Sequence, residues 1–185
     1  MGHGGGDVIA ELVADHREAA EMFDRIEHTA VAADRQTAVE RLTIELVRHT
    51  VVEEEHLCPA IREHLPDGDV VADKEIADHS LVEKLVKDLE GLDAEGPEFD
   101  RLLAALKSEV TAHVRDEEEN LFPRLRRACP QGVLDALGDE ARRAKDLAST
   151  GALPDVLRTP PADGLSAPGA GLADRVRDIV TGRGR

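Results

Sequence analysis

The sequence has no tryptophan or tyrosine, only two cysteines and no long hydrophobic run among its 185 residues. No apolar stretch approaches the roughly 18 residues that a membrane-spanning helix needs, and the glycine-rich start does not resemble a signal peptide. The two cysteines, Cys58 and Cys129, lack the paired spacing of a thiolate metal site, so we expect reduced structural residues. These absences favour a cytoplasmic protein with no membrane partner.

Basic residues are also scarce relative to acidic ones. The chain has 23 Lys and Arg against 39 Asp and Glu, which gives a formal net charge of −16. This excess repels phosphate backbones, and no basic stripe reverses it locally. Nucleic acid is therefore not expected as a partner. Most of the carboxylates are interpreted as solvated helix faces, which leaves a few for another purpose.

Strand signals are nearly absent, and helix signals take their place. Long runs rich in Ala, Leu, Glu, Arg and Val carry apolar residues three and four positions apart, which predicts helices. We therefore predict an all-α fold, an antiparallel up-and-down four-helix bundle over residues 1–128. An additional helix is predicted at 129–149, a flexible linker rich in Pro and Gly at 150–171, and a short tail helix at 172–185.

Two finer expectations concern the helices of the bundle. The third helix is expected to carry its apolar residues at Ile76, Leu81, Leu85, Val86 and Leu89, facing inward. Pro59 and Pro123 fall inside otherwise helical patterns, where the missing backbone donor should kink or end the helix. Because each proline stands ten residues after a histidine, the expected bend occurs twice.

A duplicated pattern is the most informative feature of the chain. Each half, about residues 7–66 and 67–128, contains an Asp-His pair, a His-x-x-x-Glu motif and a proline. The first copy consists of Asp15, His16, His49, Glu53 and Pro59, and the second of Asp78, His79, His113, Glu117 and Pro123. Corresponding residues are 63 or 64 positions apart. A repeat of this length in a helical chain indicates a duplicated helix pair, and its most faithfully repeated side chains are metal-binding types.

The spacing explains how these side chains can meet. Residues four apart in a helix project from one face, about 40° and 6 Å from each other. His49 and Glu53 therefore share a face, and antiparallel pairing of two helices of similar length sets His16 beside His49. The second half repeats this arrangement. Four histidines and two glutamates are too many for one tetrahedral ion but suit two ions of iron, manganese or zinc bridged by carboxylates.

Other polar residues near the motif have open roles. Glu83, one turn after the third motif histidine, faces the same side and is an additional candidate ligand. His56 is a weaker candidate, because its counterpart in the second half is an asparagine. Asp15 and Asp78 either support the neighbouring histidines or lie exposed, and we favour exposure. Three further histidines are interpreted as surface residues, namely His3, His28 and His64.

Together these motifs resemble the hemerythrin family, in particular the bacterial hemerythrin-like proteins with a His-His-Glu (HHE) cation-binding domain. The likeness covers about residues 7–127. It implies a four-helix bundle around a non-haem centre of two iron ions joined by an oxo or hydroxo bridge. The implied terminal ligands are His16, His49, His79 and His113, and the implied bridging ligands are Glu53 and Glu117. Oxygen-carrying hemerythrins have a second histidine where this chain has Glu83; a carboxylate there should favour ferric iron and lower the reduction potential.

The resemblance implies a protein that binds or reacts with a small diatomic gas or a peroxide: dioxygen, nitric oxide or hydrogen peroxide. Detoxification of peroxide or nitric oxide under oxidative stress is the enzymatic form of this function. A non-enzymatic oxygen or iron sensor or store is the alternative, and a metal-free interaction module is the third.

The pocket is expected to be dry, lined by Leu46, Leu106 and Val110 with Phe23 and Phe122 nearby. The missing tryptophan and tyrosine suit an oxidant site, although Ala- and Leu-rich bundles often lack them anyway. The oligomeric state is left open.

Overall fold

The computed structural model describes residues 6–149 and 176–177, and every regular element within them is helical. The elements are α1 (Val8–His28), α2 (Ala32–Val52), η1 (Glu53–Leu57), α3 (Cys58–His64), α4 (Gly68–Leu89), α5 (Pro97–Asp116), η2 (Glu117–Leu121), α6 (Phe122–Ala128) and α7 (Gln131–Ser149). Both η1 and η2 are single π-helical turns. No strand occurs in the described part of the chain, which confirms the predicted all-α fold.

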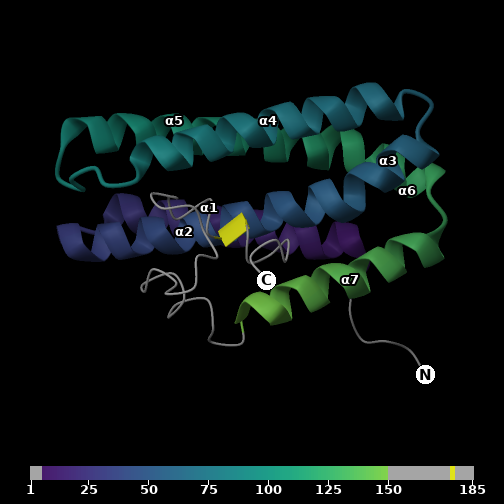
Figure 1. Cartoon of the computed structure of the whole chain (residues 1–185), viewed down its shortest axis with the longest axis horizontal. Helices are drawn as coiled ribbons and strands as arrows, with labels where there is room; N and C mark the ends of the chain where they lie inside the picture. The colour runs from purple at the N-terminus through teal and green to yellow at the C-terminus, as the bar shows by residue number, and fades with distance from the viewer. Residues whose placement is uncertain (1–5, 150–175, 178–185) are drawn as a thin grey trace, which may run out of the picture.

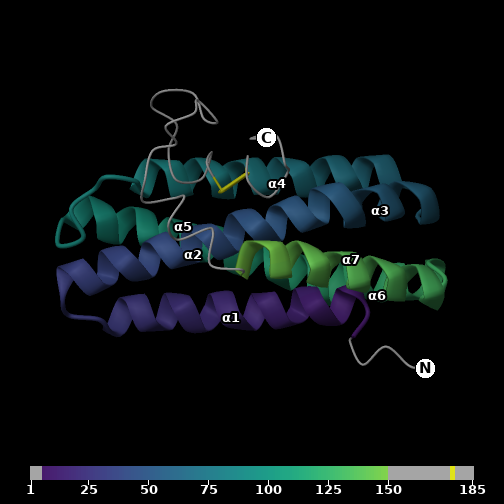
Figure 2. The same ribbon diagram turned by 60° about the horizontal axis from the view of Figure 1, so that its bottom comes forward.

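The helices form two antiparallel pairs that close into a four-helix bundle (Figure 1). α1 packs against α2, and α4 packs against α5, while α3 and α6 continue beyond α2 and α5. α7 lies outside the bundle and runs along α1, as the turned view also shows (Figure 2). The predicted up-and-down four-helix bundle is therefore confirmed, with one further helix on its outside.

Local sequence signals explain where the long helices begin and end. The Asp7 side chain accepts a hydrogen bond from the Ala10 backbone N–H at 2.9 Å and so caps the N-terminus of α1. Pro97 occupies the first turn of α5, where its missing N–H would have no helical partner anyway. Gly91 adopts a φ of 78° just after α4, a conformation that glycine tolerates best. These signals mark the start of α1 and the turn between α4 and α5.

The inward face of α4 differs from the one expected. Ile76 and Leu81 are 36% and 43% exposed, so the expectation that they face inward is wrong. Val86 and Leu89 are buried as expected, and the buried stripe of α4 is completed by Ala72, Glu75, His79 and Val82. These positions recur every three or four residues. Because two of them are polar, the apolar residues alone do not reveal the true face.

A layer of buried polar side chains divides the apolar core into two clusters. The cluster nearer the α1–α2 and α4–α5 loops includes Phe23, Leu42, Val86, Phe99 and Leu106. The cluster at the opposite end includes Leu12, Ile61, Leu121, Phe122 and Leu125. In each long helix of the bundle the change from one cluster to the other falls close to a histidine of the duplicated motif. The polar layer is thus enclosed by apolar side chains at both ends.

Each half of the bundle has a π-helical turn that starts at the glutamate of its His-x-x-x-Glu motif. These glutamates are Glu53 in η1 and Glu117 in η2, and each carbonyl accepts from the backbone N–H five residues later. The helical path therefore continues to Pro59 and Pro123, which lie in the first turns of α3 and α6. A proline is tolerated in a first turn because no N–H is needed there. Such π turns often occur at functional sites.

Two of the predicted segments fall largely outside the described residues. The linker at 150–171 lies wholly outside them. Of the tail helix predicted at 172–185, residues 176 and 177 are described; both are helical, and Val176 is buried in the cluster that contains Phe23. Every helix within the described residues is too short or too polar to cross a membrane.

Candidate metal centre

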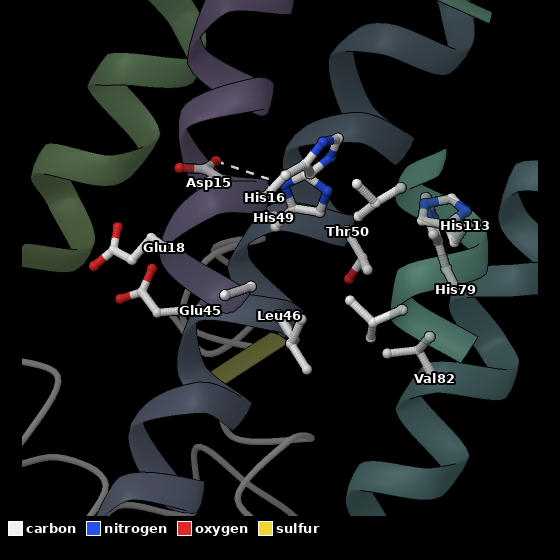
Figure 3. Close-up of a pocket in the computed structure, with 13 residues that line it drawn as sticks. Asp15, His16, Glu18, Glu45, Leu46, His49, Thr50, His79, Val82 and His113 are labelled. Atoms are coloured by element: carbon white, nitrogen blue, oxygen red, sulfur yellow. Dashed lines mark hydrogen bonds and ion pairs between the residues drawn. The ribbon is translucent and has the colours of Figure 1, made fainter. Parts of the chain in front are cut away.

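Six side chains of the duplicated motif meet in the buried polar layer. They are His16 from α1, His49 from α2, Glu53 from η1, His79 from α4, His113 from α5 and Glu117 from η2. Figure 3 shows the imidazoles in two neighbouring pairs, one pair from each half of the chain. The ring centroids lie 5.0 Å apart in the His16–His49 pair and 4.9 Å apart in the His79–His113 pair. The duplicated motif therefore forms one site.

The Nε2 atom of every one of these histidines faces a carboxylate of Glu53 or Glu117. The distances are 3.2 Å from His16 to Glu117, 3.4 Å from His49 to Glu53, 3.0 Å from His79 to Glu53 and 3.5 Å from His113 to Glu117. The Nε2 atoms of His79 and His113 are themselves 3.3 Å apart. Nitrogen atoms this close can both direct a lone pair at one ion. The histidines are thus oriented as ligands rather than as surface groups.

The potential ligand atoms fall into overlapping groups within which all atoms lie no more than 4.8 Å apart. One group consists of His16, His49, Glu53 and Glu117, and a second of Glu53, His79 and His113. Glu53 belongs to both groups. Both oxygens of Glu53 and of Glu117 are buried without a hydrogen-bond partner, which is costly for a carboxylate unless a cation compensates. The donor set therefore fits two cations that share carboxylates, and nitrogen with oxygen donors suits iron, manganese or zinc.

The outer nitrogen of each histidine, Nδ1, also faces a carboxylate. The contacts are His16 to Glu118 at 2.8 Å, His79 to Glu54 at 3.3 Å, His49 to Asp15 at 3.5 Å and His113 to Asp78 at 3.7 Å. These partners are duplicated as well: Glu54 and Glu118 follow the shared glutamates, and Asp15 and Asp78 precede the motif histidines. A carboxylate on the outer nitrogen fixes the ring orientation and raises the basicity of a metal-ligating imidazole.

The preference for an exposed Asp15 is therefore corrected, whereas Asp78 is partly exposed. The Asp15 side chain is only 12% exposed and that of Asp78 is 38% exposed, and each contacts a histidine of the second helix of its own half. The two residues of each Asp-His pair have different roles. The histidine points into the site, and the aspartate contacts the histidine on the neighbouring antiparallel helix. Sequence spacing alone did not separate this role from that of a surface cap.

The buried histidines and glutamates of the cluster shift one another's pKa values. Burial opposes a charge on His79 and on His113, but contacts with Glu53 and its neighbours raise their pKa values to about 10 and about 9. Burial and the charge of Glu53 raise the pKa of Glu117 to about 8. Burial also acts against a charged Glu53, yet the surrounding His49, His113 and His79 hold its pKa well below the ordinary value. Metal ions bound here would take the place of these protons.

Glu75 is a buried residue of this layer that sequence reasoning missed. It stands one turn before His79 on α4, and its Oε2 lies 3.4 Å from Nδ1 of His113 without a hydrogen-bond partner. Glu75 also forms a group with His113 and Glu117. Burial raises its pKa. The repeat did not indicate Glu75 as a site residue, because the equivalent residue of the first half is Leu12.

The two other candidate ligands lie elsewhere. Glu83 pairs with Lys87 at 2.9 Å and with Arg177 at 2.8 Å, and it joins none of the ligand groups found among the described residues. His56 pairs with Glu140 of α7 at 3.1 Å. Glu83 lies one turn from His79 in the direction away from the shared glutamates, whereas Glu75 lies one turn toward them. The extra carboxylate near the centre is therefore on the opposite side of His79 from the one expected.

A small cavity of about 30 Å³ opens beside the histidines (Figure 3). Its apolar wall consists of Ala19, Leu46, Val82, Val110 and Val114, and its polar lining includes the four motif histidines with Asp15, Glu18, Glu45 and Thr50. Leu46 and Val110 line the pocket as expected, whereas Leu106 and Phe23 belong to the adjacent core. Phe122 stacks on the His16 ring at 5.9 Å. Apolar side chains therefore border the site on one side and carboxylates on the other.

The fold and the site together define a helical-bundle protein with a buried His/Glu cluster suited to cations. The family described as hemerythrin HHE cation binding domain matches residues 7–125. The chain belongs to this family.

Two curated relatives and one solved structure are similar to the chain. An uncharacterised hemerythrin-like protein of Schizosaccharomyces pombe is 25% identical over 173 residues, which are 91% of this chain and 84% of that protein. A DNA nickase of Nostoc sp. is 26% identical over 132 residues, 71% of this chain, and the chain spans only 37% of that protein. The crystal structure of a hemerythrin HHE cation-binding-domain-containing protein from Mycobacterium kansasii has a TM-score of 0.74 at 19% identity, covering 92% of this chain and 99% of that one. This last likeness shows the shared fold.

Proposed function

We propose that the chain is a non-haem di-iron protein that binds or reacts with a small oxidant: dioxygen, hydrogen peroxide or nitric oxide. The observation that carries the proposal is the convergence of four imidazole Nε2 atoms on two buried carboxylates that belong to overlapping ligand groups. Two histidines from each half can serve one ion, and the carboxylates between them can serve both. Bundle cores commonly hold dinuclear sites in this way.

The proposed ligand set follows from this geometry. His16 and His49 would hold one iron, His79 and His113 the other, and Glu53 and Glu117 would bridge them. In place of Glu83 we assign Glu75 as the additional carboxylate, because it is buried beside His113. Bound iron would supply the one-electron chemistry, and an oxo or hydroxo bridge is expected between two ferric ions. Added negative charge next to the ions should favour the ferric state.

The size of the cavity supports a small ligand. A volume of about 30 Å³ corresponds to roughly two water-sized probes, because one occupies about 10–15 Å³. A diatomic gas or peroxide fits such a space, and a metabolite does not. The side chains of Leu46, Val82 and Val110 make that side of the site apolar. The chain's own part in the reaction is therefore to orient the ligands, limit the size of the small molecule that enters and provide one apolar face.

Metal analysis of the purified protein combined with its absorption spectrum tests the proposal. We expect about two irons per chain and near-ultraviolet absorption from an oxo-bridged diferric centre in air, which changes after reduction and after peroxide. The variant Glu53→Ala removes a shared carboxylate and should lose both features. A protein that binds only zinc, or no metal after incubation with ferrous iron, would refute the proposal and favour the interaction module.

A non-enzymatic oxygen or iron sensor or store is the alternative, because the same centre could serve it. Repeated peroxide consumption would support an enzyme, whereas one reversible oxygen per centre would support a carrier or sensor.

We do not propose nucleic acid as a partner, even though one relative is a DNA nickase. The matched region is a minor part of that protein, and the net charge of −16 acts against phosphate binding.

A further inference from the structure

We propose that the C-terminal extension tunes the reduction potential of the metal centre through two cations, Lys145 and Arg177. The term C-terminal extension is used here for α7 together with Val176 and Arg177, which all lie beyond the family match at residues 7–125. The inference rests on the proposed di-iron function. It assigns a role to a part of the chain that contributes no candidate ligand.

Lys145 reaches one motif histidine through Asp15. Its Nζ lies 2.6 Å from Oδ1 of Asp15, and the other oxygen of that carboxylate lies 3.5 Å from Nδ1 of His49. Lys145 also contacts Glu11 at 3.4 Å and is only 19% exposed, so its ammonium is held between α7 and α1. One carboxylate therefore connects a cation of α7 to a histidine of the site.

Arg177 makes an equivalent contact behind His79 of the second half, through Glu54 of the first half. Its Nη1 lies 2.9 Å from Oε2 of Glu54, and Oε1 of the same carboxylate lies 3.3 Å from Nδ1 of His79. The other guanidinium nitrogen contacts Glu83 at 2.8 Å, and the preceding Val176 is buried in the bundle core. The extension thus anchors itself beside the site and places a second cation behind a second histidine.

The two remaining histidines have a different environment. The carboxylate behind His16 is Glu118, whose side chain is 39% exposed. Those behind His113 are Glu75 and Asp78, and both contact Lys74 of their own helix, whose side chain is 49% exposed. The C-terminal extension therefore supplies a partly buried cation to one histidine in each half, His49 and His79. Screening by water weakens exposed pairs more than partly buried ones.

The effect of the two cations on electron donation by the histidines has a definite direction. A carboxylate that faces Nδ1 makes the imidazole a stronger electron donor, which stabilises ferric iron. A cation on the other oxygen draws negative charge away and weakens this effect. Removal of Lys145 or Arg177 should therefore leave a more electron-donating histidine and a more negative site. Both consequences lower the midpoint potential, since hydrogen bonding and charge near the ligands set the potential of such centres.

Redox titration of the full-length, iron-loaded protein tests the proposal. We expect Lys145→Met and Arg177→Gln each to lower the midpoint potential, and the double variant to lower it further. The matched controls are Lys107→Met and Arg101→Gln. They remove the same charges from exposed pairs with Glu27 and Glu98, which support no histidine of the site. Shifts no larger than those of the controls, or shifts upward, would overturn the inference.

A second measurement separates this inference from the proposed function. In the zinc-loaded protein, proton NMR should show that Lys145→Met moves the Nδ1 proton resonance of His49 and that Arg177→Gln moves that of His79. Neither variant should move the resonance of His16. Unmoved resonances overturn the inference whatever the native metal is. Fewer than two irons per wild-type chain with moved resonances would refute the di-iron function alone.

Discussion

The two halves of the bundle agree in the residues that face the metal positions and differ in most that surround them. Each half supplies two histidines, one shared glutamate, an aspartate behind one histidine and a π-helical turn at the glutamate. Around this common set, Leu12 of the first half stands opposite Glu75 of the second, and His56 stands opposite Asn120. The comparison teaches that the candidate ligands are repeated on both sides of the cluster, while the residues around them are not.

The differences follow from what each half contacts. α1 of the first half packs against α7, so its Asp15 is enclosed and meets Lys145. Asp78 of the second half remains near the surface and meets Lys74 of its own helix. The inner residues of the two halves are thus equivalent, while their outer supports are not. The following predictions test this distinction.

The largest expected effect tests the equivalence of the inner residues. His49→Ala and His113→Ala should each lose bound metal, and to the same extent. Bound metal stabilises only the folded protein, by about 4 kcal/mol when its concentration is 1,000 times Kd, and this contribution would disappear. Iron content and thermal unfolding with and without iron measure the effect. His56→Ala is the control. Two irons per chain in either ligand variant would contradict the ligand assignment.

The next effect tests the unequal supports. Asp15→Asn and Asp78→Asn should both weaken metal binding, because loss of a carboxylate behind a ligand histidine typically lowers affinity by about 10- to 100-fold. We expect the larger loss for Asp15, which is less exposed than Asp78. Competition with a chelator measures both affinities. Equal losses would show that burial of the support makes no difference.

A smaller effect is expected at Glu75, where the second half differs in residue type from the first. Glu75→Leu restores the residue type of the first half and removes a buried carboxylate whose Oε2 has no hydrogen-bond partner. The metal-free protein should gain about 1–3 kcal/mol of stability, the usual cost of such a group. Urea unfolding in the presence of a chelator measures it. Glu83→Leu, on the same helix, should give no gain, because Glu83 makes close ion pairs with Lys87 and Arg177 at 2.9 and 2.8 Å, whereas the contacts of Glu75 with Lys74 and His113 are longer, at 3.5 and 3.4 Å. Destabilisation by Glu75→Leu would oppose this account.

The smallest effect is expected at the N-termini of α1 and α4, where the two halves of the bundle begin. Asp7 caps α1, whereas Asp67 before α4 makes no capping hydrogen bond. Asp7→Ala should cost about 1 kcal/mol and Asp67→Ala almost nothing. Burial opposes the charge of Asp7, but the Ala10 N–H, Gln131 and Arg126 lower its pKa below 3.8. Its contribution is therefore complete above that pH and is lost as the pH falls through the lowered value. A gap between wild type and Asp7→Ala that widens in acid would contradict this sign.

Much of the fold could be predicted because helical periodicity and the repeat are local features of the chain. The bundle and the meeting of His16, His49, His79 and His113 followed from offsets in the sequence. The face of α4 could not be obtained in this way, since its buried stripe mixes polar and apolar side chains. Glu75 was missed for that reason, and Ile76 was placed inside.

The amino-acid sequence by itself determined the helical class, the duplicated donors and the family, because these depend on residue type and spacing along one chain. Only the tertiary structure decided which carboxylates stand behind the histidines, which side of His79 carries the extra glutamate, and how α7 and Arg177 meet the bundle. These contacts join residues far apart in the chain, and their partners are chosen by packing and by the burial of charge.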